Sequence, residues 1–213
     1  MASAAPTCRV SCATCWPRGR RYGDRYGSAS ISIRRAFCEA CVIGADRSDF
    51  EFHPLNREQH SGAVAAFYER TGDYGLMERG ELPDAATVQG FFGDCPPGCD
   101  PNQSLKLACL DGPGGIIGIA DMAFGFPETP DAYIGLLLID PKMRAQGIGR
   151  RFLHHLVGQA QARHCTRMLV AVLDENMRGR SFWEREGFVL EKTFEPRDIG
   201  SKRHVLHRLI RPL

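Results

Sequence analysis

The chain has 213 residues, of which 43% are hydrophobic and 24% are charged, and its formal net charge at pH 7 is +2. This is the composition of a globular protein, and so small a net charge gives no reason to expect a nucleic-acid partner. No apolar stretch reaches the roughly 18 residues of a membrane-spanning helix, and no apolar run near Met1 indicates a secretory signal. We therefore expect a cytoplasmic protein with no membrane partner, made of a leader at 1–47 and one folded domain at 48–213.

The leader is rich in Arg, Ser, Gly and Ala and shows no sustained helical or strand periodicity. We predict that it is disordered, and two alternatives stay open. Cys12 and Cys15 form one Cys-x-x-Cys pair, and Cys38 and Cys41 form another, so the leader offers four thiolates to a structural zinc ion. The loop between the pairs is somewhat longer than is usual for such a site. The excess of Arg over acidic residues is also typical of a transit peptide.

The first half of the domain predicts two helices and a hairpin. Val64, Phe67 and Tyr68 share one face of a helical pattern, and Pro83-Asp84 is typical of a helix start. A glycine-rich turn at 111–115 separates two apolar runs, which predicts a hairpin. The expected elements are a strand at 50–55, a helix at 57–70, a short helix from 83, and strands at 104–110 and 116–126.

The second half centres on residues 133–139, a continuous apolar run that reads Tyr-Ile-Gly-Leu-Leu-Leu-Ile. Such a run predicts a central strand that is buried on both faces. The helical stripe that follows includes Phe152, Leu153 and Leu156. The expected elements are a helix at 147–163, a strand at 167–173, a helix at 177–186, and strands at 188–194 and 203–210. Strands alternating with helices predict a mixed α/β sheet with both faces covered.

The segment between that strand and that helix is the most informative about chemistry. It reads Ile139-Asp-Pro-Lys-Met-Arg-Ala-Gln-Gly-Ile-Gly-Arg-Arg151. A helix N-terminus carries unpaired N–H groups and a partial positive charge, and glycine lets a ligand approach the backbone closely. Arg150 and Arg151 stand in the first turn, where a helix by itself favours acidic residues, so the segment predicts a turn that binds the phosphate of a nucleotide-like molecule. Phe152 occupies the third glycine position of a dinucleotide fingerprint, and the Lys-Ser/Thr of a P-loop is missing.

The stretch Arg144-Ala-Gln-Gly-Ile-Gly149 resembles the Arg/Gln-x-x-Gly-x-Gly/Ala loop of the GNAT superfamily of N-acetyltransferases, which holds the pyrophosphate of acetyl-coenzyme A. A second segment, Asp174-Glu-Asn-Met-Arg-Gly-Arg-Ser-Phe-Trp-Glu-Arg-Glu-Gly-Phe188, is similar to the Asn-x-x-Ala-x-x-x-Tyr-x-x-x-Gly-Phe element of that family. The resemblance covers about residues 50–210. It implies a mixed, mostly antiparallel central sheet flanked by helices, and an acyltransferase that moves the acetyl group of acetyl-coenzyme A, its co-substrate, to a primary amine.

The resemblance also implies which residues hold the coenzyme. Backbone N–H groups of the loop would bind the pyrophosphate, and the end of the preceding strand would pair with the pantetheine arm. An N–H at that strand end would polarise the thioester carbonyl. No residue is expected to bind a metal at this site. The expected cofactor-binding residues are Leu137, Leu138, Ile139, Arg144, Ala145, Gln146, Gly147, Ile148, Gly149, Arg150 and Asn176.

Candidate catalytic residues are fewer. Asp121 interrupts an apolar strand, which is costly unless the carboxylate faces a cleft or a partner, so we weigh a base or amine-binding role against a structural one. Tyr133 lies where some members of the family place a Glu base. The family's Tyr, which can protonate the departing thiolate, is replaced by Trp183, whose N–H is no proton source and which also fits a core position. Ala171 stands where ribosomal-protein alanine acetyltransferases carry Glu, so that specific activity is not implied.

Three functions therefore remain open. The first is an N-acetyltransferase acting on a small-molecule or peptide amine, with an acceptor pocket around 67–74 and 194–198. The second is a non-catalytic domain that binds or senses an acyl-coenzyme A, with Trp183 marking the lost chemistry. The third is a zinc-knuckle interaction protein. Whether the chain forms a homodimer is also open.

Overall fold

The computed structural model describes residues 12–13, 50–112 and 115–213. Cys15, Cys38 and Cys41 lie outside the described residues, as does most of the leader for which disorder, zinc binding or a transit role was considered. The helices are α1 (Arg57–Arg70), α2 (Gly72–Arg79), α3 (Ala85–Gly93), α4 (Ile148–Ala162) and α5 (Met177–Arg185). The strands are β1 (Cys12–Ala13), β2 (Phe50–Pro54), β3 (Leu105–Asp111), β4 (Gly115–Phe124), β5 (Asp131–Ile139), β6 (Arg167–Leu173), β7 (Val189–Thr193), β8 (Arg197–Ile199), β9 (Lys202–His204) and β10 (Leu206–Pro212).

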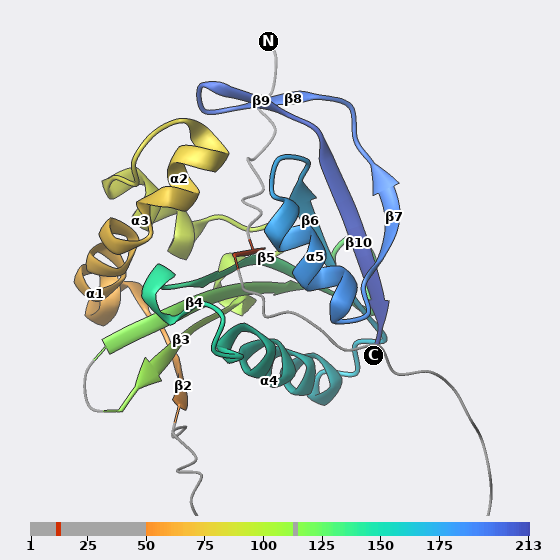
Figure 1. Ribbon diagram of the computed structural model, residues 1–213. Helices are drawn as coiled ribbons and strands as arrows, with labels where there is room; N and C mark the ends of the chain where they lie inside the picture. Colours follow the sequence, from red (N-terminus) through yellow and green to blue (C-terminus); the bar gives the residue numbers. More distant parts are fainter. Residues whose placement is uncertain (1–11, 14–49, 113–114) are drawn as a thin grey trace, which may run out of the picture.

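The main sheet has the order β2-β3-β4-β5-β6-β10-β7, with β1 paired to β5 off this path (Figure 1). All neighbouring strands are antiparallel except β5 with β6 and β1 with β5. Strands β8 and β9 form a separate antiparallel hairpin. The mixed, mostly antiparallel sheet expected from the sequence is confirmed.

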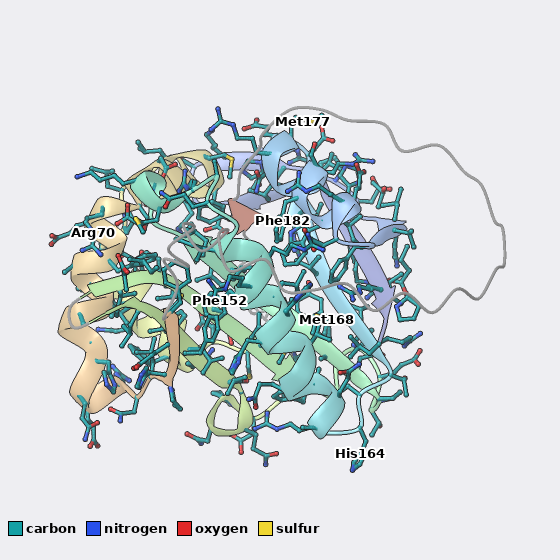
Figure 2. The ribbon with its side chains drawn as sticks, turned by 60° about the horizontal axis from the view of Figure 1, so that its bottom comes forward. Arg70, Phe152, His164, Met168, Met177 and Phe182 are labelled. Carbon is teal, nitrogen blue, oxygen red and sulfur yellow. The ribbon has the colours of Figure 1, made fainter. Side chains whose placement is uncertain are left out.

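Helices cover both faces of this sheet. α4 and α5 contribute Phe152 and Phe182 to one core cluster, and Figure 2 looks at this side, where α4 lies across the strands. Helices α1 to α3 form the opposite cluster with residues such as Phe67 and Phe91. Strand β5 feeds both clusters, because Leu137 belongs to the first and Leu136 to the second. Every residue of β5 is buried, as the apolar run predicted.

Three features differ from the sequence prediction. Helix α2 was not expected, because it is short and contains two glycines, which weaken a helical pattern. The hairpin β8–β9 was not expected either, since strands of three residues are too short to show alternation. The last strand begins at Leu206 rather than 203, because Lys202–His204 belongs to that hairpin.

The hairpin sits tightly on the end of α2. Gly200 adopts a left-handed φ of 60°, and a Cβ there would lie 2.6 Å from the carbonyl oxygen of Arg79. The backbone N–H of Ser201 donates to that same oxygen at 2.9 Å.

Within the described residues, no helix combines the length and the apolar surface needed to cross a bilayer.

The packing of α4 can be tested by removing one ring. Phe152 has no exposed surface and lies 4.9 Å from the ring of Phe52. We expect Phe152→Ala to lower the free energy of unfolding in urea by about 3–5 kcal/mol, because the substitution leaves a cavity. His154→Ala, at an exposed position of the same helix, is the control and should change stability little. Equal effects of the two substitutions would contradict this description of α4.

Candidate functional site

The site begins where two parallel strands separate. β5 pairs with β6 only from Asp131 to Ile134, whereas it pairs with β4 as far as Ile139. The register with β4 shifts at this point, so Gly135 has no partner in the ladder. The part of β5 that follows Gly135 therefore has one edge that β6 does not cover.

The paired part of the two strands is clamped by a buried charge pair. The guanidinium of Arg167 donates two hydrogen bonds of 2.7 Å to the carboxylate of Asp131, which has no exposed surface. Glu128 accepts a third at 2.8 Å. The hydrogen bond to Asp131 raises the pKa of Arg167 above its ordinary value, so the guanidinium keeps its charge. The strands are thus held together at one end and apart at the other.

An extended segment of the chain occupies the gap. Strand β1 runs parallel to β5, with Cys12 opposite Leu137 and Ala13 opposite Leu138, and it also contacts α5. In Figure 1 it is the short red segment beside β5, near the middle of the molecule. The edge of β5 that β6 leaves uncovered therefore accepts an extended chain that supplies its own polar groups, as edges that bind peptides do.

At the end of β5 the chain enters the loop before α4. Ala145 and Gly147 both have left-handed backbones, with φ of 69° and 80°. The backbone therefore alternates here between left-handed and ordinary conformations. Such alternation turns successive N–H groups to one side and makes a concave site for an anion. Among the described residues, no side chain caps the N-terminus of α4, and its first turn holds no acidic residue. The geometry suits the phosphate-binding role expected for 144–150.

The two arginines of this loop differ in role. Arg144 is tied down, because its Nε donates to the Ile139 carbonyl oxygen at 2.9 Å and its guanidinium pairs with Asp73 of α2 at 2.5 and 3.1 Å. It holds the loop against β5 and α2. Arg150 is largely exposed at the first turn of α4, with its Nε 3.6 Å from the Glu186 carboxylate.

The residues expected on α5 are both buried. Asn176 caps this helix, since its side-chain oxygen accepts from the N–H of Gly179 at 2.9 Å. Trp183 has no exposed surface and packs edge-on between Phe182 and Phe188, each 4.9 Å away. Its indole N–H has no hydrogen-bond partner among the described residues. This is the environment of a core aromatic residue.

The two candidate catalytic residues are not brought together. The Asp121 carboxylate lies 2.7 Å from the Nζ of buried Lys106, beneath α3, so its charge is balanced within the fold. Lys106 also donates to the carbonyl oxygen of Asp94 at 3.2 Å. Tyr133 belongs to another cluster on the same face of the sheet, with its ring 5.2 Å from Phe126.

Sequence reasoning missed a buried carboxylate on α2. Glu78 is only 5% exposed, and the hydroxyl of Tyr74 donates to its Oε1 at 3.0 Å. The Nε2–H of His204, on β9, donates to the Glu78 carbonyl oxygen at 2.8 Å. No sequence pattern pointed to Glu78, because neither α2 nor the hairpin that carries His204 was predicted.

Glu78 faces a narrow cavity between α2 and β5. Within the described part of the chain, no three His, Cys, Asp or Glu side chains gather as metal ligands, there or elsewhere. The cavity is lined by Tyr68, Thr71, Tyr74, Gly75, Glu78, Arg79, Glu81, Leu82, Pro83, Thr87 and Leu136.

Comparison with known proteins agrees with this geometry. The family model "Acetyltransferase (GNAT) family" matches residues 78–188, and the chain belongs to this family of acyltransferases. Members of the family generally use acetyl-coenzyme A as co-substrate. A comparison with curated protein sequences gives no match.

Solved structures share the fold at low sequence identity. An acetyltransferase from Thermus thermophilus is 22% identical, with a TM-score of 0.62 over 78% of this chain and 99% of that one. The ribosomal-protein-S18-alanine N-acetyltransferase of Escherichia coli is 16% identical, with a TM-score of 0.56 over 76% and 93%. The GNAT domain of S. lividans PAT is 19% identical, with a TM-score of 0.59 over 77% and 90%.

The loop geometry can be tested by making the same Gly→Ala substitution just before α4, at Gly147, and inside α4, at Gly158. Gly147→Ala places a Cβ on a left-handed residue, which costs about 1–2 kcal/mol and should reshape the loop and weaken coenzyme binding. Gly158→Ala, in the helix interior with open space around it, should instead stabilise the fold by about 1 kcal/mol. Urea unfolding and calorimetric titration with coenzyme A measure both effects. Equal coenzyme affinity in the two variants would contradict the role of the loop.

Proposed function

We propose that the protein is an N-acetyltransferase that moves the acetyl group of acetyl-coenzyme A onto a primary amine of a small molecule or peptide by direct attack. The observation that carries this proposal is that β5 separates from β6 after Ile134, shortly before the loop that leads to the N-terminus of α4, which no described side chain caps. Consecutive parts of the chain thus offer a strand edge for an extended arm and N–H groups for a diphosphate.

The coenzyme would lie along the edge of β5 and the start of α4. Backbone N–H groups from Ala145 to Arg150 would bind the pyrophosphate, where the dipole of α4 also favours negative charge. The pantetheine arm would pair with β5 at Leu137 to Ile139. Asn176, which caps the helix on the other side of the gap, would border the arm.

The reaction needs few groups once both reactants are bound. The acceptor enters as an ammonium ion and loses a proton, and the nitrogen lone pair then attacks the thioester carbon. An N–H of β5 near Leu137 would stabilise the oxyanion. The C–S bond breaks, the nitrogen releases its second proton, and the coenzyme leaves as a thiol. Because a thiol pKa lies near about 8.5, water can supply the proton that Trp183 cannot. Holding the reactants in contact contributes much of the rate.

A thiol-release assay tests this function. We expect acetyl-coenzyme A to release free thiol in the presence of at least one amine from a panel of polyamines, amino acids, aminoglycosides and peptides with free N-termini. Mass spectrometry should show the amine heavier by one acetyl group. Tight coenzyme binding without thiol release for any of these amines would favour a non-catalytic acyl-coenzyme A domain instead.

Strand β1 and the pantetheine arm would use the same edge of β5, so they should exclude each other. Replacing Cys12 and Ala13 by proline removes the backbone N–H groups of β1, so this segment can no longer donate a hydrogen bond to β5. At about 0.5–1.5 kcal/mol for a hydrogen bond, we expect this double variant to bind coenzyme A roughly two- to ten-fold more tightly by calorimetry. The control is Ala4→Pro with Ala5→Pro, outside β1. Unchanged affinity in the first variant would show that β1 does not compete with the coenzyme.

A further inference from the structure

We propose that Thr193 is the nucleophile of a second acyl-transfer site, where its hydroxyl takes the acetyl group of an activated ester or thioester. His207 is the general base of this step, and Asp174 positions His207. The product is O-acetylated Thr193, a modification distinct from the N-acetylation proposed above. The inference goes beyond that function and does not depend on it, because none of the three residues is assigned to the coenzyme site.

The three side chains form one continuous line of hydrogen bonds. Oγ1 of Thr193 lies 2.9 Å from Nδ1 of His207, and Nε2 of the same ring lies 2.9 Å from Oδ1 of Asp174. Thr193 ends β7, His207 is the second residue of β10, and Asp174 follows β6. A hydroxyl, an imidazole and a carboxylate at these distances are the parts that activate a side chain for nucleophilic attack.

The direction of these hydrogen bonds follows from the chemistry of the carboxylate. An ionised carboxylate can only accept, so Nε2 of a neutral His207 carries the proton and donates it to Asp174. The lone pair is then on Nδ1, and the Thr193 hydroxyl donates to it. Asp174 therefore selects the tautomer in which His207 can take the proton of the Thr193 hydroxyl.

The base is held in place, while the nucleophile is accessible. His207 is only 9% exposed, and it stands opposite Val172 in the ladder, on the face of the sheet that α4 and α5 cover. A buried ring with both nitrogens hydrogen-bonded keeps one orientation. Thr193 is exposed and belongs to β7, the last strand of the main sheet (Figure 1). An acyl donor can thus reach its hydroxyl from solvent without entering a cavity.

Thr193 also offers a backbone donor for the oxyanion. The neighbouring N–H, that of Phe194, donates to the Leu206 carbonyl oxygen at 2.9 Å, towards β10. Because successive N–H groups of a strand alternate between its two edges, the N–H of Thr193 points to the outer edge of β7. No described strand covers that edge. This N–H lies on the same residue as the attacking hydroxyl, close to where the negative oxygen of the tetrahedral intermediate forms.

This site is separate from the strand edge proposed to bind the coenzyme. The order of the sheet places β7 three strands away from β5. Neighbouring strands lie about 4.8 Å apart, so Thr193 stands at least about 14 Å from β5. An acetyl group held against β5 does not reach Thr193 across this distance. The hydroxyl therefore takes its acetyl group from a donor that approaches from solution.

The step balances with these groups alone. The Thr193 oxygen attacks the acyl carbon, and Nδ1 of His207 takes the hydroxyl proton. The bond between the acyl carbon and the departing sulfur or oxygen then breaks, and His207 returns the proton to that leaving group. With acetyl-coenzyme A the products are O-acetyl-Thr193 and the free thiol, and with an aryl acetate they are O-acetyl-Thr193 and the phenol.

Site-resolved mass spectrometry of the full chain tests this proposal, with 4-nitrophenyl acetate and acetyl-coenzyme A as two separate donors. We expect Thr193 to gain an acetyl group from at least one donor about 100-fold faster than Thr129, since a general base contributes at least that factor. Thr129 is an exposed threonine between β4 and β5 and serves as the internal control. Acetylation by one donor alone supports the site and identifies the leaving group that it accepts.

His207→Gln is the decisive variant, because it removes the base and leaves the nucleophile. Acetylation of Thr193 should fall about 100-fold or more, whereas His154→Gln, at an exposed position of α4, should change nothing. Thr193→Ser keeps the hydroxyl and should retain the reaction. Thr193→Val should lose it and should leave thiol release with an amine unchanged, because Thr193 lies far from β5.

Asp174→Asn tests the positioning residue and decides the matter if His207→Gln does not fold. It should slow acetylation of Thr193, and ¹⁵N NMR of His207 should show the Nε2–H tautomer in the wild-type protein and a mixture of tautomers in the variant. The proposal is overturned if Thr193 reacts no faster than Thr129 with both donors, or if neither His207→Gln nor Asp174→Asn slows it. Should the wild-type protein acetylate Thr193 but no amine, the N-acetyltransferase function fails while this inference stands.

Discussion

The structure depends on the need of one buried strand edge, that of β5 after Gly135, for hydrogen-bond partners. After Ile134, strand β5 leaves its parallel neighbour β6, and the edge from Leu136 to Ile139 lies deep in the molecule with only the two residues of β1 paired to it. Buried N–H and C=O groups must find partners, because leaving them unpaired costs about as much as a lost hydrogen bond. The separation of β5 from β6 leaves such groups at the centre of the fold, and an extended segment pairs with them. In the structure that segment is β1, and in the proposed complex it is the pantetheine arm.

Neighbouring contacts fix the point at which β5 and β6 separate and the position of the loop that follows β5. The Asp131–Arg167 pair prevents the two strands from separating further back, and Arg144 fastens the loop to Ile139 and to α2. Strand β5 then packs against two layers of helices through its alternating faces. Leu137 and Ile139 lie with the α4 cluster, whose helix starts at the anion site. Leu136 faces the helices α1 to α3 and lines the small cavity between α2 and β5.

Much of this arrangement was visible in the sequence, because it rests on local pattern. The apolar run of β5, the apolar stripe of α4 and the glycines between them each span enough residues to indicate an element. The Asp121 argument was sound in its physics, since a carboxylate in an apolar strand needs a partner. That partner is Lys106 on the neighbouring strand, which no local pattern could identify.

What the sequence could not indicate rests on short elements and distant contacts. Glu78 stands on a two-turn helix with glycines, and His204 stands on a strand of three residues. Neither carries a recognisable period, and their contact joins residues far apart in the chain. Strand β1 has two residues and no pattern of its own, so its place beside β5 follows only from the edge that needs it.

A crystal structure of the full chain with coenzyme A would test the central claim most directly. We predict that the pantetheine arm lies along Leu137 to Ile139 in place of β1, with the diphosphate held by N–H groups between Ala145 and Arg150. The claim would be contradicted if β1 stayed beside β5 while the coenzyme bound elsewhere, or if those N–H groups were satisfied by the chain itself.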